Sequence, residues 1–446
     1  MDRRDFLGKS ALIGAGVAGT GVLLSSCGSG KSKYTPLRAP GEYYIPELPD
    51  KAVDGRPLKL GLIGCGGRGC GAVRNLLEAA DGVTLTAMAD VFSDKIDEAR
   101  AKLKDKHGIE VPEESCFVGF DAYKKVIDSG VDMVICTTPP VFRPEHFRYA
   151  VEKGVHAFLE KPVSVDPKGF RTILAASKMA EAKGLSVVTG TQRRHHRAYV
   201  ESFQKIQEGL LGEITGGNVY WNQGMLWYRE RQRGWSDMEW MIRDWVNWKW
   251  LSGDHIVEQH VHNIDVFNWF IGRFPIKATA VGGRHRRITG DQYDCFSVDF
   301  EYEGGVHLHS LCRQIDGCSG EVGEFVQGTL GSWSSKDFAI RNHKGEVVWQ
   351  YDMEYQEKTW WQSNPYVLEH VDWINHIRRG QGHVEAAETG MSSLAGAMGR
   401  EAAYTGATVS WDEYSASQQD YLPSRLSLGP MDMSGYAIQV PGAPKQ

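Results

Sequence analysis

The stretch "LKLGLIGCGGRGCGAVRNLLEAADGVTLTAMAD", residues 58–90, decides the fold of this chain. An apolar strand meets a glycine-rich turn, a helical pattern follows, and a second apolar strand ends at Asp90. This order is one βαβ unit. Because apolar strands and helical segments keep alternating after it, we predict an α/β domain over residues 58–185 with a parallel, doubly wound sheet.

The glycine turn has the spacing of a dinucleotide site. Gly64, Gly66 and Gly69 form G-x-G-x-x-G between strand and helix, where the backbone can approach a pyrophosphate and the helix N-terminus supplies amides. Asp90 can accept hydrogen bonds from the adenosine ribose and would repel a 2′-phosphate. We therefore predict NAD rather than NADP, although the positive charge of Arg68 weakens this preference. The alternative is a glycine-rich turn that binds nothing.

The pattern changes after residue 185. Longer alternating strands indicate an α+β domain over residues 186–446, with a large, open, mainly antiparallel sheet. The chain has 446 residues, which suits two domains. Its formal net charge is −6 and it has no long basic run, so nucleic acid is not expected as a partner.

The first residues are predicted to be an export signal rather than part of the fold. "RRDFL" at residues 3–7, followed by an apolar, glycine-rich run, is typical of a twin-arginine signal, and "LSSC" ending at Cys27 resembles a lipobox. We expect residues 1–27 to direct the protein to the periplasm, with a lipid on Cys27, and residues 28–57 to form a tether and lead-in. The alternative is a transmembrane anchor, for which the run is short.

"LEKPVSV" places Glu160 and Lys161 at the end of a predicted parallel strand, where doubly wound folds bind ligands. On its own, Lys161 reads more readily as a surface charge. With the glycine turn, Asp90 and "TTPP" in order before it, the chain resembles the Gfo/Idh/MocA family. "GLLGEI", "GTLG" and "AAYTGATVSW" in the second half add to the resemblance.

The resemblance implies an N-terminal Rossmann domain, a C-terminal open-faced sheet domain, a nicotinamide cofactor between them and a sugar or polyol substrate. We also expect a homo-oligomer. Lys161 would bind the reacting hydroxyl. The residues implied to hold the cofactor are Gly64, Gly66, Gly67, Arg68, Gly69, Asp90, Thr138, Pro139, His146, Glu160, Lys161 and Gln192.

A polar stripe is predicted on the helix within "SGDHIVEQHVHNID", residues 252–265. At 100° per residue, His255, Glu258, His262 and Asp265 fall within an arc of about 80°. His260 points the other way and is predicted to be a core histidine. A single metal ion on the stripe is not expected, because its two histidines lie about 10.5 Å apart along the axis.

The resemblance assigns a function to this stripe, since the family has an acid followed four residues later by a histidine at the nicotinamide. Glu258 and His262 match that spacing, with Glu in place of the more usual Asp. We predict that His262 is the base for the hydroxyl proton, that Glu258 orients it and that Lys161 stabilises the alkoxide. A purely structural stripe is the alternative. We also predict that Asp265 contacts the substrate.

Tryptophans are concentrated just before this helix, in residues 220–250. Core packing explains most of them, but aromatic faces also stack on sugar rings. We predict a carbohydrate pocket that uses Arg229, Trp235, Arg243 and Trp248.

The predicted function is that of an exported oxidoreductase with tightly held NAD, acting on a secondary alcohol of a sugar or glycoside, such as the one at C3. One alternative is a glycosidase that oxidises, eliminates, adds water and reduces. The NAD-dependent α-N-acetylgalactosaminidases of this superfamily resemble that case, but their Thr-His-Gly-Leu-Gly-Pro segment is replaced here by "EQHVHN". A sugar-binding lipoprotein with an idle NAD is the non-enzymatic alternative.

Overall fold

The computed structural model describes residues 43–442, so the predicted signal, Cys27 and the first half of the tether lie outside the described residues. In the described part of the chain, no helix is both long and apolar enough to cross a membrane. Its seven cysteines are free thiols.

The first domain contains a six-stranded parallel sheet with the order β3-β2-β1-β4-β5-β6. This is the doubly wound arrangement predicted from the sequence. The strands are short and almost wholly apolar because helices cover both faces. Their bounds are β1 Leu58–Ile63, β2 Val83–Asp90, β3 Cys116–Val118, β4 Met133–Cys136, β5 His156–Leu159 and β6 Val187–Thr189. Since β6 lies past residue 185, the sheet extends beyond the boundary drawn from the sequence.

Five helices accompany these strands: α1 Gly67–Ala79, α2 Ser93–His107, α3 Ala122–Asp128, α4 Arg143–Glu152 and α5 Pro167–Ala182. The second domain begins with the 3₁₀ turn η3 Gln192–His195 and with α6 Arg197–Gln207. Its other helices are α7 Asp237–Arg243, α8 Lys249–Ser252, α9 His255–Glu258, α10 Val261–Ile271, α11 Met353–Thr359, α12 Pro365–Arg379, α13 Ala386–Thr405 and α14 Trp411–Ala416.

The second sheet has nine strands in the order β14-β13-β12-β11-β7-β10-β9-β8-β15. All neighbours are antiparallel except β7 and β10, so the sheet is mixed but mainly antiparallel, as predicted. The strands are β7 Ile214–Gln223, β8 Lys277–Gly283, β9 Cys295–Tyr302, β10 Val306–Gln314, β11 Glu321–Gly328, β12 Gly331–Ser334, β13 Ala339–Asn342, β14 Val347–Gln350 and β15 Val409–Ser410.

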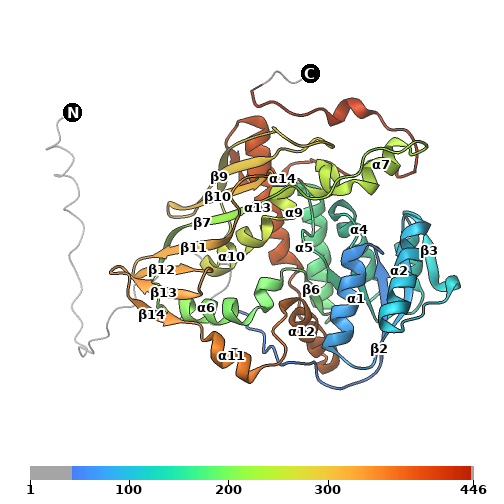
Figure 1. Cartoon of the computed structure of the whole chain (residues 1–446), viewed down its shortest axis with the longest axis horizontal. Helices are drawn as coiled ribbons and strands as arrows, with labels where there is room; N and C mark the ends of the chain where they lie inside the picture. The colour runs from blue at the N-terminus through green and yellow to red at the C-terminus, as the bar shows by residue number, and fades with distance from the viewer. Residues whose placement is uncertain (1–42, 443–446) are drawn as a thin grey trace, which may run out of the picture. The chain divides into compact units, whose positions relative to one another are not determined.

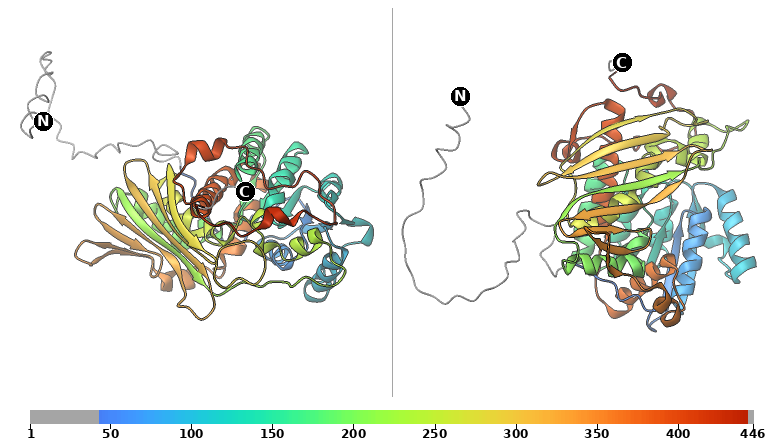
Figure 2. Two further views of the ribbon diagram at one scale, coloured as in Figure 1. Left: turned by 90° about the horizontal axis from the view of Figure 1, so that it is seen from above. Right: turned by 60° about the vertical axis from the view of Figure 1, so that its left-hand side comes forward.

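The helices of the described residues lie on one face of this sheet (Figure 2). The side chains of β9 and β10 accordingly alternate between buried and more accessible positions. The last long helices connect the two domains: α13 packs on β8, α10 and α5, and α12 packs on α1 and η3 (Figure 1). The active-site elements are therefore held by contacts from both domains.

Candidate active site

The glycine turn lines a cavity of about 520 Å³ at the ends of β1, β2 and β4. A Cβ added to Gly64, whose φ is +99°, would lie 2.8 Å from the Thr138 amide nitrogen, and one on Gly69 would lie 2.1 Å from the Gly64 carbonyl oxygen. At Gly66 and Gly67 an added Cβ would meet no atom within 4 Å. Gly64 and Gly69 are thus required by chain packing, whereas Gly66 and Gly67 border open space that a ligand can enter.

This cavity fits a dinucleotide. α1 begins at Gly67, and its N-cap Gly66 has no side chain to occupy the first amides, which leaves them and the positive helix end for a pyrophosphate. Asp90 lines the same cavity, and its carboxylate accepts hydrogen bonds from the amides of Cys65 at 2.8 Å and Phe92 at 3.1 Å. The residues present therefore suit the diphosphate and ribose groups of NAD.

Thr138, Pro139 and His146 line the wall of the cavity beside Gly64. The Thr138 hydroxyl lies 3.2 Å from Nδ1 of His146, and Tyr123 packs on the imidazole ring at 4.1 Å between centroids. Burial lowers the pKa of His146 to about 3, so this wall is neutral at pH 7.

Arg68 joins the turn to two buried carboxylates. Its Nε donates to Glu160, and its Nη2 lies 3.2 Å from Glu369 of α12. Burial opposes ionisation of Glu160, but Arg68 and Lys161 lower its pKa, whereas burial raises the pKa of Glu369 well above its usual range. The Arg68 guanidinium also lies 5.0 Å from the ring centre of Tyr366.

Lys161 is the second residue after β5 and is mostly buried. Its Nζ is 3.0 Å from Oε1 of Glu258 and also donates to the Glu258 carbonyl oxygen, while its amide lies 3.1 Å from Oε2 of Glu160. Lys161 is therefore no surface charge. It forms a buried link between the end of the parallel sheet and the second domain.

His262 lies in the second domain, close to this cationic group. Its ring stacks on Trp221 of β7 with centroids 5.6 Å apart, and the Arg193 guanidinium covers Trp221 at 5.5 Å. Burial, followed by the charges of Lys161, Arg193 and Arg68, holds the pKa of His262 well below its usual range. Its Nδ1 is buried without a hydrogen-bond partner among the described residues. His262 is thus a neutral imidazole at pH 7.

The predicted continuous helix is wrong. α9 ends at Glu258 and α10 starts at Val261, and the His260 amide bonds to the His255 carbonyl five residues earlier. The interruption lies where His260, fully buried, places Nε2 2.7 Å from the Ser310 hydroxyl of β10. Among the described residues no hydrogen bond or ion pair joins Glu258 to His262, so Glu258 contacts Lys161 instead of orienting the imidazole.

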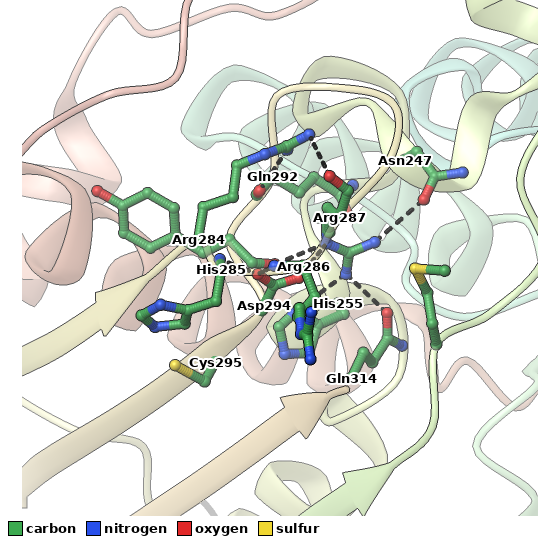
Figure 3. A network of polar contacts seen from close by, with 12 residues as sticks. Asn247, His255, Arg284, His285, Arg286, Arg287, Gln292, Asp294, Cys295 and Gln314 are labelled. Carbon is green, nitrogen blue, oxygen red and sulfur yellow. Dashed lines mark hydrogen bonds and ion pairs between the residues drawn. The ribbon is translucent and has the colours of Figure 1, made fainter. Parts of the chain in front are cut away.

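His255 also leaves the predicted stripe. Its Nδ1 lies 2.9 Å from Asp254 and 3.3 Å from Nη2 of Arg287. Arg287, in the loop between β8 and β9, further donates to Asn247 and Gln314 (Figure 3). His255 therefore belongs to a separate buried network that fixes this loop.

The structure places two of the predicted substrate residues in the core. Asp265 accepts two hydrogen bonds from Arg194, at 2.8 and 3.0 Å, and one from Ser392, which leaves no free oxygen facing the cavity. Trp248 is buried and packs against Trp240 at 5.0 Å. Both predictions are wrong, because Asp265 is paired with Arg194 and Ser392 and Trp248 packs against Trp240.

Arg229 and Arg243 do line the cavity, together with Trp227 and Trp245. Arg243 lies at the end of the cavity near Phe92 and Asp94. Trp235 lies beside Arg243, with the guanidinium 5.1 Å from its ring centre. Five predicted site residues do not line this cavity: Lys161, Glu258, His262, Glu160 and Gln192. Gln192 donates to Tyr366 at 3.2 Å, next to Arg68.

Both halves of the chain match one family. Residues 58–191 match its "NAD-binding Rossmann fold" domain and residues 203–410 its "C-terminal alpha/beta domain". The chain belongs to the Gfo/Idh/MocA oxidoreductase family.

Several characterised proteins are similar to it. The scyllo-inositol 2-dehydrogenase (NAD(+)) of Bacillus subtilis is 24% identical over 73% of this chain and 87% of its own length. A glycosyl hydrolase family 109 protein of Streptomyces coelicolor is 27% identical over 49% of this chain, a match that spans 44% of that relative. Matches to other relatives likewise span about half of their length. The Lactobacillus casei scyllo-inositol dehydrogenase with bound NAD(H) and scyllo-inositol has the same fold, with a TM-score of 0.59, 19% identity and coverage of 79% of this chain and 99% of that one.

In this Gfo/Idh/MocA member, four residues of the site were not predicted from the sequence: Arg193, Trp221, Tyr366 and Glu369. Trp221 lies in the tryptophan-rich stretch 220–250, and Arg193 directly follows the predicted cofactor residue Gln192. What placed them was the pairing of β7 with β10 and β11 and the return of α12 onto α1. Neither contact has a local sequence signal.

Buried neutral histidines are expected to make the fold acid-sensitive. Burial lowers the pKa of His260 to about 3, whereas an unfolded histidine titrates near pH 6.5. Between these values only the unfolded state takes up the proton, so stability is full above pH 6.5 and falls by about 1.4 kcal/mol per pH unit below it for each such group. In urea unfolding at pH 7 and pH 5, His260→Gln should show a smaller loss of stability than the parent. An unchanged pH dependence would contradict a neutral His260.

Proposed function

We propose that this protein transfers a hydride between a secondary alcohol of a sugar or glycoside, such as the one at C3, and NAD held in the glycine-turn cavity. The observation that carries the proposal is the buried Lys161, held by Glu258 of the second domain next to neutral His262. These groups have the chemistry that alcohol oxidation requires, since a base must remove the hydroxyl proton and a cation must stabilise the developing alkoxide.

NAD would be held by Gly66, Gly67 and the first amides of α1, with Asp90 at the adenosine ribose. When bound, the nicotinamide accepts or returns the hydride. His262 would take the hydroxyl proton on its imidazole. Lys161 would donate a hydrogen bond to the substrate oxygen, and Glu258 would position the ammonium through the contacts it already makes. The cationic surroundings of His262 would also favour an oxyanion.

Tight retention of the cofactor is supported by residues 227–245 of the second domain, which border the end of the cavity near Phe92 and Asp94. Arg243 of α7 reaches Asp94, at the start of α2, with two hydrogen bonds of 2.9 and 3.0 Å. Its guanidinium lies 3.8 Å from the ring centre of Phe92. Trp227 and Trp245 of the same segment line the cavity. An exported enzyme needs such retention, because no NAD pool is at hand outside the cytosol.

Arg243→Ala should therefore speed NAD release by at least tenfold, because it removes both the ion pair and the stacked cation that join the segment to the nucleotide domain. The rate is measured from nucleotide appearing in the filtrate of the purified protein during dilution. Arg231→Ala is the matched control, since Arg231 lies in the same segment but pairs with Asp237 within it. Equal release rates for both variants would refute the retaining role of Arg243.

A glycosidase cycle is the second candidate, favoured by the similarity to glycosyl hydrolase family 109 proteins. The two functions differ in product. Incubation with p-nitrophenyl glycosides should give a keto-glycoside and a shift in absorbance at 340 nm without p-nitrophenol for the oxidoreductase. Catalytic release of p-nitrophenol would instead support the glycosidase.

The remaining parts of the proposal concern the protein in its cell. We propose twin-arginine export to the periplasm, a lipid anchor on Cys27 and assembly into a homo-oligomer. Cell fractionation of the parent and of Cys27→Ala tests the first two. We expect the parent in the membrane fraction, on the periplasmic side, and Cys27→Ala in the soluble fraction.

A further inference from the structure

A cluster of histidines and carboxylates lies on α12, apart from the proposed active site. Asp372 and His376 stand four residues apart on this helix, and His383 lies in the loop that follows it. One ligand atom from each of the three residues lies within 4.8 Å of those of the other two. None of the three lines the glycine-turn cavity. The proposed hydride transfer gives this cluster no role.

The arrangement has the features of a metal-binding set. Side chains four residues apart on a helix project from the same face, and such a pair is a common chelate for Zn²⁺. The His376 and His383 rings are nearly parallel, at 19°, with centroids 4.8 Å apart. Asp372 Oδ1 lies 3.7 Å from His376 Nε2. Tetrahedral Zn²⁺ with bonds of about 2.0–2.1 Å needs ligand atoms roughly 3.4 Å apart, so small rotations would close the site.

A second layer of side chains orients these residues. His195 Nε2 lies 3.1 Å from Oδ2 of Asp372, the oxygen on the far side from His376, and 3.4 Å from Glu385. Glu385 Oε1 in turn lies 3.5 Å from His383 Nε2. Metal sites characteristically have such outer partners, which fix ring orientation and ligand basicity. His195, Asp372 and Glu385 form a metal-competent triad themselves, but all three are buried, whereas His376 and His383 are partly accessible to an entering ion.

Tyr44, from the segment before β1, fills the middle of the set. Its hydroxyl lies 2.5 Å from Asp372 Oδ1 and 2.7 Å from His376 Nε2. A hydroxyl at hydrogen-bond distance from both atoms marks the position where they converge. A metal ion there would displace this bridge, and the tyrosine oxygen or a water would complete four-coordination.

We propose that Asp372, His376 and His383 bind one divalent transition-metal ion, with Zn²⁺ as the best match. Two imidazoles and one carboxylate suit Zn²⁺ better than Ca²⁺ or Mg²⁺, which prefer oxygen ligands. The ion would connect α12 to the loop before α13 beside the lead-in segment. It would thereby be structural, and its binding is independent of NAD and of catalysis.

Metal binding to the purified, untagged full-length protein tests the proposal. After dialysis against a chelator and then metal-free buffer, Zn²⁺ titration by calorimetry should show one site with a Kd of micromolar or lower, and Zn²⁺ should raise the unfolding temperature. His376→Ala and His383→Ala should each weaken binding at least 100-fold. His107→Ala, which removes an exposed histidine at the end of α2, should leave it unchanged.

Asp372→Asn provides a second test that retains the shape of the side chain. It removes the negative charge while leaving atoms for the contacts with Tyr44 and His195, and it should also lose Zn²⁺. Circular dichroism of each variant verifies folding. A parent that binds no Zn²⁺, or a His376→Ala/His383→Ala double variant that binds it as tightly as the parent, overturns the proposal.

Discussion

His262→Ala is expected to slow single-turnover reduction of the bound cofactor by about 10²–10⁴-fold, the usual contribution of a positioned general base. NAD should remain bound, because the glycine turn and Asp90 are untouched. Stopped-flow absorbance at 340 nm with saturating glycoside measures the rate, and nucleotide released on denaturation measures occupancy. His260→Gln is the control two residues away, since His260 contacts Ser310 in the core. Loss of rate in a folded His260→Gln with normal rate in His262→Ala would assign the base to the wrong histidine.

The pH profile provides an independent check on His262. A base acts in its neutral form, and burial with nearby cations holds the pKa of His262 well below its usual range. Neutral imidazole therefore persists to lower pH, and the acid limb of the single-turnover rate should lie clearly below pH 6.5. A limb centred at pH 6.5 would show that His262 is solvated and unshielded, contrary to the structure.

Lys161→Met should reduce the same rate by at least 10²-fold, because the substrate oxygen loses its cationic hydrogen-bond donor. The change also leaves Glu258 buried without its partner, which costs about 3–5 kcal/mol of stability where a buried ion pair is broken. Loss of rate and loss of stability must therefore be separated.

The double variant Lys161→Met/Glu258→Gln separates them. Replacing the unpaired carboxylate by a neutral amide should restore much of the unfolding free energy, measured by urea titration, while the rate stays low. If the double variant regained both stability and rate, Lys161 would have only a structural role. If it regained neither, the buried pair would not be the cause of the instability.

The architecture was largely predictable from the sequence. Apolar strands separated by helical segments specify the parallel sheet, and the strict alternation in β9 and β10 specifies a sheet covered on one face. The glycine turn was equally predictable, because the close approach of Gly69 to Gly64 leaves no room for a side chain. These features depend on residues near one another in the sequence.

The second domain's part of the site was less predictable. Helical periodicity predicts one continuous helix, but the helix is interrupted at residues 259–260, which separates His255 and Glu258 from His262. Asp265 has the same local pattern as a ligand-facing acid, yet Arg194, 71 residues away, pairs with it. Contacts between residues so distant in sequence are determined by tertiary packing, which helical periodicity cannot predict.

The most direct test of the central claim is the nucleotide content of the protein purified from its natural host after export. We predict that denaturation releases close to one NAD per chain, and that adding glycosides to the native protein increases absorbance at 340 nm by the amount expected for that NAD. Protein that releases no NAD and gains no activity when NAD is supplied would contradict it.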